Sequence, residues 1–574
     1  MDTNVLYYGD NLEILRKYIP DSSIDLVYLD PPFNSKATYN VLYKEKTGEP
    51  SQAQITAFED TWHWGLESEK ALQEIFESPI APSAVKDFMS VMPKFLGKKT
   101  DMAAYLAMMC VRLVELKRVL KETGSIYLHC DPTASHYLKI VMDAIFYPKN
   151  FRNEIIWRRT ASHNQAKRYG PIHDVILYYS KADKYYYKVN YRPLLKGHVT
   201  EYFTKENEKG KYWTNALTGA GTRKGESGLP WKGYDPTKRN RHWAIPGSLC
   251  VELGIPNELS PQEKLNELYE NGEIVLPPEG SRALPTYHQY LNGSRGIPFQ
   301  DIWVYQPHTK NVLYQSEEAI DEDVKWLTRQ GDTERLGYET QKPLGLLRRI
   351  IECSCPQDGV LLDPFCGCGT AVVEAERLNR KWIGIDITHL AISTMKWRLE
   401  KMFPNIQYIV VGEPKDLAGA KELASQNKYQ FQWWAVALVG GQPYGDKKKG
   451  ADTGIDGYLY FMDEKNKVKK GIIQVKSGEV GVRLIRDLVG VVKREKAEMG
   501  IFLCLEPITK PMQTEADSEG FYHSPLGKDY PKIQILTIEQ LLAEGKKPDI
   551  PPWIAPVGTP PTAKKTEGKA IKML

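Results

Sequence analysis

The sequence predicts an α/β fold in which helices cover a largely parallel sheet, and three observations support it. Short apolar strands alternate with helices from residue 5 to about residue 150, and the alternation returns between residues 345 and 403. A further α/β region spans roughly residues 425 to 548. A chain of 574 residues is too long for one hydrophobic core, so we expect three or four domains.

The N-terminal elements follow a regular order. We expect a strand over residues 5–8, a helix over 12–18, a buried strand over 25–29, a helix over 101–121 and a strand over 125–129. Gly124 ends the long helix, because glycine commonly follows the last helical turn. This order of strand and helix is the one from which layered α/β domains are built.

The middle of the chain has a different composition. Residues 160 to 330 lose the alternation and become rich in Gly, Pro, Tyr and Lys, which indicates an inserted domain. Residues 151–250 hold 19 Lys and Arg against 8 Asp and Glu, although the net charge of the whole chain is only +4. The same stretch holds 16 aromatic residues, among them Trp157, Tyr185, Tyr186, Tyr187, Trp213, Trp231 and Trp243. This mixture suits a surface that neutralises phosphates and stacks on bases, and a Tyr-rich β domain with a solvated surface explains it equally well.

Five segments follow from these patterns. We expect the first half of an α/β domain over residues 1–160, an insert over 161–335, the second half of that domain over 336–412, a second α/β domain over 420–548, and a tail over 549–574. The tail holds Pro, Thr and Lys with few apolar residues, so we expect it to be disordered.

Composition excludes several classes of protein. With 42% apolar and 26% charged residues, the chain resembles an ordinary soluble globular protein. We find no basic N-terminal patch followed by an apolar stretch and no apolar run of about 18 residues, so we expect a cytoplasmic protein without membrane contact. The pairs Cys353/Cys355 and Cys366/Cys368 are separated by one residue, whereas zinc pairs usually have roughly two to four, so we expect reduced thiols without metal.

A glycine turn in the second half predicts a cofactor site. An apolar strand ends at Asp363, the turn Phe365-Cys366-Gly367-Cys368-Gly369-Thr370 follows, and a helix begins after it. Glycines let the backbone approach a ligand, and the N-terminus of the helix offers unpaired N–H groups. The next strand ends at Asp386, whose carboxylate can accept hydrogen bonds from two ribose hydroxyls. Such a unit could bind NAD or S-adenosylmethionine, and the absence of G-x-G-x-x-G spacing disfavours a dinucleotide.

A second motif, Asp30-Pro31-Pro32-Phe33, follows the buried strand near the N-terminus. An exocyclic amine on a base is a poor nucleophile, because its lone pair is conjugated into the ring. The Asp30 carboxylate and the Pro31 carbonyl can accept its two N–H protons and so free the lone pair for attack on a sulfonium methyl. Two prolines fix that carbonyl, and Phe33 offers a stacking face. Taken alone, the motif is equally a strand that ends in a Pro-Pro turn.

Taken together, the two motifs resemble those of β-class DNA amino-methyltransferases, in which the catalytic motif precedes the cofactor motif in the chain. The resemblance covers roughly residues 4 to 405, and it includes Gly9-Asp10 and the stretch from Gly337 to Pro343. It implies a Rossmann-like S-adenosylmethionine-dependent methyltransferase fold with an inserted target-recognition domain. The implied catalytic residues are Asp30, Pro31, Pro32 and Phe33, and the implied cofactor-binding residues are Asp10, Lys342, Pro343, Asp363, Phe365, Gly367, Gly369, Thr370 and Asp386.

The resemblance also implies a substrate. Asp-Pro-Pro-Phe usually accompanies methylation of adenine N6 in double-stranded DNA, whereas N4-cytosine enzymes more often have Ser at the first position. The target base must leave the duplex to reach such a pocket. Members of this family often work as dimers, so a homodimer is one expectation. Methylation of RNA or of a protein stays open as an alternative.

The C-terminal α/β region carries a third pattern. Asp456 opens one strand, and Gln474 and Lys476 share a face of the next strand. This pattern resembles the Mrr-like branch of the PD-(D/E)xK nucleases, which implies that Asp456 and Gln474 bind a metal such as Mg²⁺ and that Lys476 orients the attacking water. The relatives often have a Glu where this chain has Gln432. Two hypotheses therefore stay open: restriction and modification in one polypeptide, or a solitary methyltransferase with a C-terminal domain that binds DNA without cleaving it.

Overall fold

The structure is a computed structural model of the chain. It describes residues 1–32, 64–97, 100–162, 167–279, 281–328, 332, 334–336, 340–443, 454–464 and 467–551. The chain divides into two compact units, and each is described by itself. Unit 1 holds residues 1–188, 301–304 and 323–574, and unit 2 holds residues 189–300 and 305–322.

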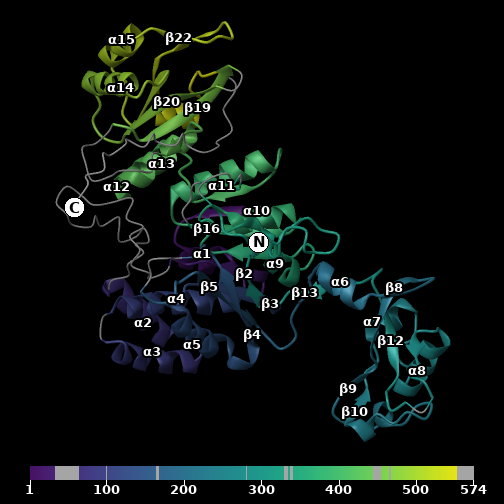
Figure 1. The fold of residues 1–574 in the computed structure, drawn as a ribbon. Coiled ribbons are helices and arrows are strands. Elements are labelled where there is room, and N and C mark those ends of the chain that lie inside the picture. The colour runs from purple at the N-terminus through teal and green to yellow at the C-terminus, as the bar shows by residue number, and fades with distance from the viewer. Residues whose placement is uncertain are drawn as a thin grey trace, which may run out of the picture. The chain divides into compact units, whose positions relative to one another are not determined.

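Unit 1 is built on a nine-stranded sheet, and the predicted α/β fold is confirmed (Figure 1). In spatial order the strands are β14 (Ile302–Trp303), β4 (Phe151–Arg158), β5 (His173–Ser180), β3 (Leu120–Cys130), β2 (Ile24–Leu29), β15 (Val360–Asp363), β16 (Lys381–Asp386), β1 (Val5–Tyr8) and β17 (Ile409–Val411). Neighbours pair in parallel except where the antiparallel β5 meets β3 and β4.

The centre of this sheet joins two distant parts of the sequence. Strand β2 pairs in parallel with β15, and Leu26 lies opposite Leu361. Strand β15 pairs in parallel with β16 on its other side. Because the carboxyl ends of parallel strands meet at the same edge of a sheet, the residues that follow β2, β15 and β16 share one edge.

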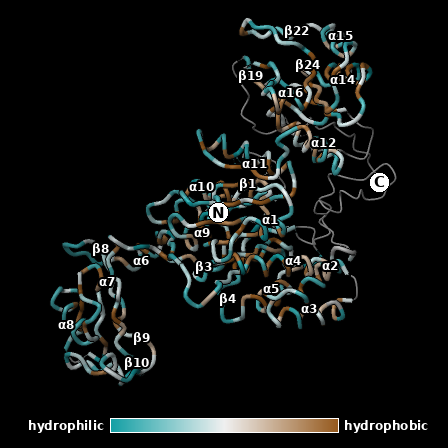
Figure 2. Tube along the Cα trace, turned by 180° about the vertical axis from the view of Figure 1, so that it is seen from behind, coloured by the Kyte–Doolittle hydropathy of each residue, from teal (hydrophilic) through white to brown (hydrophobic). Residues whose placement is uncertain are grey.

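Helices cover both faces of the sheet, as expected for neighbouring strand residues that point to opposite faces (Figure 1). One face packs on α1 (Asn11–Tyr18), α2 (Leu66–Glu77), α3 (Ser83–Phe95), α4 (Asp101–Val119) and α5 (Ser135–Phe146). The other packs on α9 (Leu344–Ser354), α10 (Thr370–Arg377) and α11 (His389–Met402). Figure 2 shows apolar stretches of the trace among these strands and helices.

Unit 2 has a core of its own. A four-stranded sheet with β8 (Gly210–Ala216) and β12 (Thr286–Tyr290) at its centre accompanies the helix α8 (Pro261–Glu270), whose N-terminus is capped by Ser260. The core contains the aromatic residues Trp231 and Trp243, which are 4% and 2% exposed. These two aromatic residues therefore hold the unit together, whereas composition had left base stacking and a structural role equally open.

The start of unit 2 differs from the expected start of the insert at residue 161. Residues 173–180 lie inside the expected insert, yet they form β5, which pairs with β3 and β4 in the main sheet. The reason is that seven of the eight residues of β5 are buried, which places the strand in the core of unit 1 despite its polar surroundings in the sequence. Unit 2 accordingly begins at residue 189.

The C-terminal region contains the expected second α/β arrangement. Its sheet runs β18 (Gln442–Pro443), β19 (Gly457–Glu464), β20 (Lys467–Lys476), β21 (Met499–Cys504) and β24 (Ile533–Thr537). The first pairs are antiparallel and the last two are parallel. Helices α13 (Lys428–Leu438) and α14 (Val482–Arg494) accompany this sheet. Among the residues that the structure describes, no helix has both the length and the hydropathy to span a bilayer.

Candidate active site

The first feature of the shared edge is an ion pair between residues of two predicted motifs. Asp30 directly follows β2, and the ammonium of Lys342 contacts its carboxylate oxygen Oδ2. The side chains of Lys342 and Asp30 are 10% and 16% exposed, so the pair is largely shielded from water. The structure therefore brings together residues that are 312 positions apart in the sequence.

The other residues of the first motif are partly described. Pro31 is buried and Pro32 is half-buried, directly after Asp30. Phe33 lies outside the described residues, so its predicted stacking role is not placed by the structure. The Pro31 carbonyl therefore lies just after a core strand, where the proline ring restricts the backbone.

The glycine turn follows β15, which is the strand next to β2 in the sheet. Gly367 and Gly369 have φ values of 52° and 75°, a left-handed conformation that favours glycine. A Cβ atom on Gly369 would lie 2.5 Å from Cγ of Met395, so this position has no room for a side chain. Thr370 begins α10, and its hydroxyl donates to the Lys342 carbonyl at 3.3 Å. The turn is thereby attached to the segment that carries Lys342.

Asp386 ends β16 and holds the turn from the other side. One carboxylate oxygen accepts the backbone N–H of Gly367 at 2.9 Å, and the other accepts the backbone N–H and the hydroxyl of Thr388, both at 2.9 Å. Burial raises the pKa of Asp386, although these hydrogen bonds oppose the rise. Each carboxylate oxygen has two lone pairs, so these three hydrogen bonds leave Asp386 at most one acceptor position for a ligand hydroxyl.

Asp363 lies deeper than the sequence suggested. It is only 3% exposed, and its carboxyl accepts the backbone N–H of Phe365 at 3.1 Å. Burial raises the pKa of Asp363 well above its usual range, and the nearby carboxylates of Asp30 and Asp386 add to the rise. The structure therefore places Asp363 beneath the turn, where it orders the backbone at Phe365.

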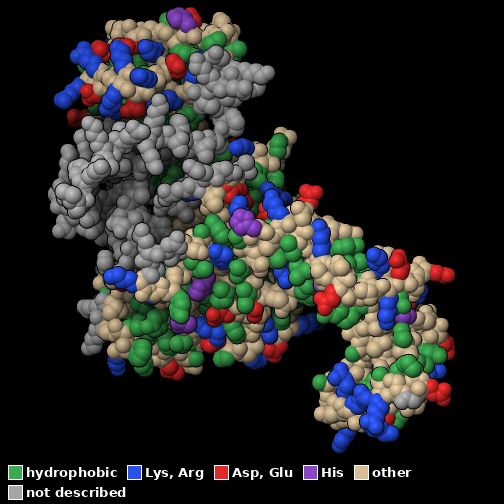
Figure 3. All heavy atoms as spheres, in the orientation of Figure 1, with side chains coloured by type: hydrophobic (Ala, Val, Ile, Leu, Met, Phe, Trp, Pro, Cys, Tyr) green, Lys and Arg blue, Asp and Glu red, His purple; other side chains and the backbone are tan. Residues whose placement is uncertain are grey.

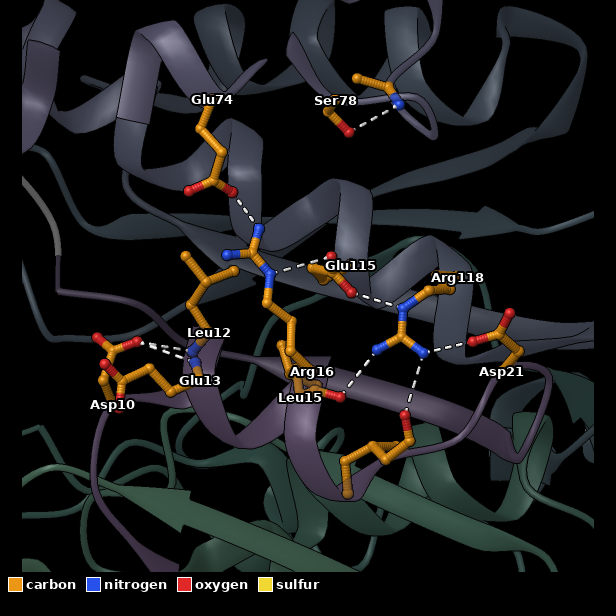
Figure 4. Close-up of polar contacts among 12 residues, drawn as sticks. Asp10, Leu12, Glu13, Leu15, Arg16, Asp21, Glu74, Ser78, Glu115 and Arg118 are labelled. Carbon is orange, nitrogen blue, oxygen red and sulfur yellow. Dashed lines mark hydrogen bonds and ion pairs between the residues drawn. The ribbon is translucent and has the colours of Figure 1, made fainter. Parts of the chain in front are cut away.

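Both carboxylate oxygens of Asp10 form contacts within the protein. Its carboxylate caps α1 by accepting the backbone N–H of Leu12 at 2.8 Å, as Figure 4 shows. The other oxygen meets Nη2 of Arg112 at 2.7 Å. Arg112 also donates to the side chain of Asn11 at 2.6 Å, and Asn11 donates to the Pro364 carbonyl at 2.8 Å. These contacts connect the start of α1 to the glycine turn.

Sequence reasoning missed Arg112 and Asn11. Arg112 lies within the apolar helix α4, about a hundred positions from Asp10, and nothing in its local sequence marks the contact. The only sequence signal was an Asp ahead of a predicted helix, which is typical of an N-cap.

Pro343 occupies the N-cap position of α9, directly after Lys342. Glu334 accepts the backbone N–H of Leu344 at 2.7 Å, which satisfies a donor at the start of that helix. Burial raises the pKa of Glu334, although this hydrogen bond opposes the rise. The segment that carries Lys342 is thus anchored at the helix start.

A second group of polar side chains, which the sequence did not reveal, lies within the strands of this sheet. Tyr28 in β2 hydrogen-bonds Nδ1 of His129 in β3 at 2.9 Å, and Nε2 of His129 contacts Asp174 in β5 at 3.2 Å. The other oxygen of Asp174 lies 3.2 Å from Nε of Arg159. Tyr28, His129 and Asp174 are nearly fully buried, so this polar chain crosses three central strands without access to water.

Unit 2 has a basic surface near β9 (Thr218–Ala220) and β10 (Arg241–Trp243). Figure 3 shows Lys and Arg side chains gathered over this end of the unit. The exposed residues of the stretch, which we call the basic patch, are Arg223, Lys224, Lys232, Lys238 and Arg239. Exposed cations are suited to phosphate contacts.

The predicted metal site of the C-terminal region offers few ligands. Asp456 is 9% exposed, and its Oδ2 accepts the backbone N–H of Val475 at 2.8 Å. Gln474 is 3% exposed, and its Oε1 has no hydrogen-bond partner among the described residues. Lys476 ends β20. The described part of the chain contains no group of three or more His, Cys, Asp or Glu that could hold a metal ion. One partly committed carboxylate and one amide do not fit Mg²⁺, which prefers several oxygen ligands.

The fold and this edge of the sheet define a Rossmann-like α/β protein. Residues 24–396 match the model of the N6_N4_Mtase family, whose description is DNA methylase. The match covers more than half of the chain, and the chain belongs to this family. Residues 429–543 match a second model, described as NACHT-associated inactive Restriction Endonuclease 1. The expected relation to Mrr-like nucleases is therefore not confirmed, since the matched restriction-endonuclease domain is described as inactive.

Individual relatives are consistent with the family. The chain is 30% identical over 302 residues to the type II methyltransferase M.EcaI of Enterobacter cloacae, which covers 52% of this chain and 57% of the relative. It is 25% identical over 388 residues to the Mod subunit of the type III restriction-modification enzyme StyLTI of Salmonella typhimurium, covering 66% and 50%. The chain spans about half the length of these relatives. A solved structure of a DNA modification methylase from Thermus thermophilus with S-adenosyl-L-methionine aligns at 14% identity and a TM-score of 0.31, over 71% of this chain and all of that one.

Proposed function

We propose that the chain transfers a methyl group from S-adenosylmethionine to N6 of adenine in double-stranded DNA. One observation carries the proposal: Asp30 follows β2, the glycine turn follows the adjacent β15, and Asp386 ends the next strand, β16. A donor held by the turn and an amine held by Asp30 would lie at the same edge of the sheet. Membership in the DNA methylase family agrees with this arrangement.

The residues at this edge fit the cofactor. Asp386 keeps at most one acceptor position for a ribose hydroxyl, and the left-handed glycines allow close approach of a ligand to the backbone. Lys342 supplies a cation for a carboxylate at the methionine end. When bound, S-adenosylmethionine supplies an electrophilic methyl group on a sulfonium. Lys342 and Pro343 lie next to the turn, because the Thr370 hydroxyl donates to the Lys342 carbonyl and Pro343 follows Lys342.

The protein residues prepare the amine. The Asp30 carboxylate and the Pro31 carbonyl accept its two N–H groups and direct the nitrogen lone pair toward the methyl carbon. Bound S-adenosylmethionine would supply the methyl group and keep the electron pair of the broken S–C bond on sulfur, and the amine would give up one N–H proton to water. Asp30 holds the amine through this change because its carboxylate stabilises the positive charge that develops on nitrogen.

Adenine is proposed because Asp precedes the two prolines, and N4 of cytosine is the competing target. The relatives do not separate the two, since their names specify methyltransferases and Mod subunits without a base. We propose that unit 2 contacts DNA through its basic patch while the base leaves the duplex. A cytoplasmic location and a homodimer are part of this proposal, and light scattering of the purified protein tests the dimer.

For the C-terminal domain we propose a role without cleavage. The observation in favour is the predicted donor set, which pairs the Asp456 carboxylate with the Gln474 amide, and Asp456 already accepts the backbone N–H of Val475. The competing hypothesis is restriction and modification in one polypeptide. Unmethylated DNA with Mg²⁺ is expected to stay intact with the wild type and with Lys476→Ala. Cutting by the wild type that Lys476→Ala abolishes would establish the competing hypothesis instead.

The methyl transfer is tested with labelled S-adenosylmethionine and three acceptors: duplex DNA, RNA and protein. We expect label on duplex DNA with the wild type and none with Asp30→Ala. Label found only on RNA or protein would overturn the proposal. Sequencing of modified bases in DNA from cells that express the protein identifies both the base and the recognition site, and modified cytosine in place of adenine would correct the target.

A further inference from the structure

The ion pair between Lys342 and Asp30 occupies the group that the methylation chemistry needs. The Lys342 ammonium contacts Oδ2 of Asp30, and it also donates to the Thr340 carbonyl at 3.2 Å. A carboxylate that neutralises a shielded ammonium is a weaker acceptor for the N–H groups of a neutral amine. The protein in this structure therefore holds Asp30 in a state that is poorly suited to receive a base.

The backbone of Lys342 is hydrogen-bonded to the glycine turn. Its carbonyl accepts the hydroxyl of Thr370, and Arg398 donates to the same hydroxyl at 3.2 Å. The next residue, Pro343, is the N-cap of α9. Four flexible carbons separate this fixed backbone from the ammonium, so the charge can change partner without movement of the main chain.

We propose that Lys342 exchanges one carboxylate for another and thereby orders the binding of the two substrates. Its ammonium holds Asp30 in this structure, and the carboxylate at the methionine end of the cofactor would draw the ammonium away and release Asp30 for the base. This inference rests on the proposed function for the identity of the cofactor. Lys342 is a positioning residue in this account, because it controls the availability of Asp30 and forms no bond to the transferred methyl.

The exchange makes two binding events depend on each other. A ligand that removes Lys342 from Asp30 raises the affinity of Asp30 for the amine, and by thermodynamic linkage a captured base raises the affinity for the cofactor. In the free protein, the fraction of molecules with Lys342 released from Asp30 limits the apparent cofactor affinity.

The experiment compares two ligands that differ at the methionine end. S-adenosylhomocysteine has the carboxylate, and 5′-methylthioadenosine lacks it. Isothermal titration calorimetry of the full chain without DNA measures their affinities for the wild type, Asp30→Asn, Lys342→Met and the double variant. Asp30→Asn removes the competing charge, so we expect S-adenosylhomocysteine to bind about fivefold more tightly, because more Lys342 is available.

Lys342→Met and the double variant complete the double-mutant cycle. Lys342→Met is expected to weaken S-adenosylhomocysteine by about tenfold through loss of a charged hydrogen bond. In the Lys342→Met background, Asp30→Asn should have no further effect. Neither change should alter the affinity of 5′-methylthioadenosine by more than its experimental error. Asp21→Asn, at a side chain that is 76% exposed, serves as the matched control and should change neither affinity.

Three outcomes would overturn the exchange. Asp30→Asn could leave the affinity for S-adenosylhomocysteine unchanged or weaker, it could tighten both ligands equally, or its effect could persist in the Lys342→Met background. The assay contains no nucleic acid, so a substrate other than adenine in DNA would overturn the proposed function and leave this result standing. Failure of every protein to bind S-adenosylhomocysteine would end the cofactor assignment and the exchange together.

Discussion

The guanidinium of Arg112 lies 2.7 Å from the carboxylate of Asp10 and joins the start of the first helix to the middle of α4. Its side chain is 10% exposed and also donates to Asn11 and to the Met108 carbonyl. Burial lowers the pKa of Arg112, although the charge of Asp10 opposes this effect. A buried cation with this many partners stabilises the fold only while the partners are present.

Arg112→Met should therefore destabilise unit 1. The change removes the donor to Oδ2 of Asp10 and to the side-chain oxygen of Asn11, and we expect the free energy of unfolding to fall by about 3 kcal/mol. Urea denaturation followed by far-UV circular dichroism measures this loss. Lys17→Met, an exposed cation on α1, is the control and should change stability by less than about 0.5 kcal/mol. Equal losses in the two variants would contradict the structural role of Arg112.

Gly369 should tolerate no side chain. In Gly369→Ala the new Cβ meets Met395, and the backbone must keep a φ of 75°. Gly440 has a similar φ of 71°, but no atom lies within 4 Å of the position that a Cβ would take there. Gly440→Ala should thus cost about 1 kcal/mol for the left-handed conformation alone, and Gly369→Ala about 1–3 kcal/mol more for the overlap. Thermal denaturation of both variants checks the difference, and similar costs would show that Met395 moves away freely.

The buried carboxyl of Asp363 should make stability depend on pH. Its folded-state pKa is raised by burial, so its contribution to stability is fully present below the unfolded value of about 3.9 and is lost as the pH rises through the folded value. Asp363→Asn keeps an acceptor for the Phe365 N–H and removes the titration. We expect the variant to gain stability relative to the wild type as the pH rises from about 4 toward 8.

Urea denaturation at several pH values measures this effect of Asp363. Asp358→Asn, an exposed change in the turn before β15, is the control and should follow the wild type. If the Asp363→Asn and wild-type curves stay parallel over the whole range, the carboxyl of Asp363 does not titrate in the folded protein as its burial requires.

Local sequence was sufficient for part of the site. A buried strand that ends in Asp-Pro-Pro and a glycine turn between a strand and a helix are each encoded by a few consecutive residues. The structure places Asp30 directly after β2, the glycine turn directly after β15 and Asp386 at the end of β16. The alternation of apolar segments was sufficient for the α/β fold, because strand and helix periodicities differ.

Other parts depend on tertiary contacts that no short segment contains. The pairs Lys342–Asp30 and Arg112–Asp10 join residues 312 and 102 positions apart. Composition also cannot tell which aromatic residues face inward. A base-stacking surface and a Tyr-rich β domain explained the aromatic content equally well, and Trp231 and Trp243 lie in the core of unit 2. Polar neighbours in the sequence likewise obscured β5, whose burial depends on β3 and β4.

The buried chain from Tyr28 to Asp174 should make the protein sensitive to acid. Burial alone would raise the pKa of Asp174, but the hydrogen bond from His129 and the charge of Arg159 outweigh it and lower the pKa. A lowered folded-state pKa contributes stability above the unfolded value of about 3.9, and that stability is lost as the pH falls through the folded value. Asp174→Asn removes the charge that faces His129 and Arg159, so it should cost about 2 kcal/mol at pH 7.

The difference between Asp174→Asn and the wild type should begin to shrink as the pH falls below about 3.9, where the carboxyl becomes neutral in the unfolded chain, and it should vanish only below the lowered folded-state pKa. Denaturation at pH 7 and at several pH values below about 3.9 tests this convergence. Asp183→Asn changes a side chain that is 72% exposed and should give no difference at either pH. A cost that stays constant with pH would mean that Asp174 acts through its shape and hydrogen bonds and not through its charge.

The basic patch of unit 2 should contact DNA phosphates. Replacement of Lys232, Lys238 and Arg239 by Ala removes three exposed cations and should weaken binding to any duplex, with a salt dependence whose slope falls by about one for each lost phosphate contact. Fluorescence anisotropy at several salt concentrations measures both quantities. Lys264→Ala is the control within the same unit, because the Lys264 ammonium already donates to the Asn257 carbonyl at 2.8 Å. An unchanged slope in the triple variant, together with unchanged affinity, would assign DNA binding to another surface.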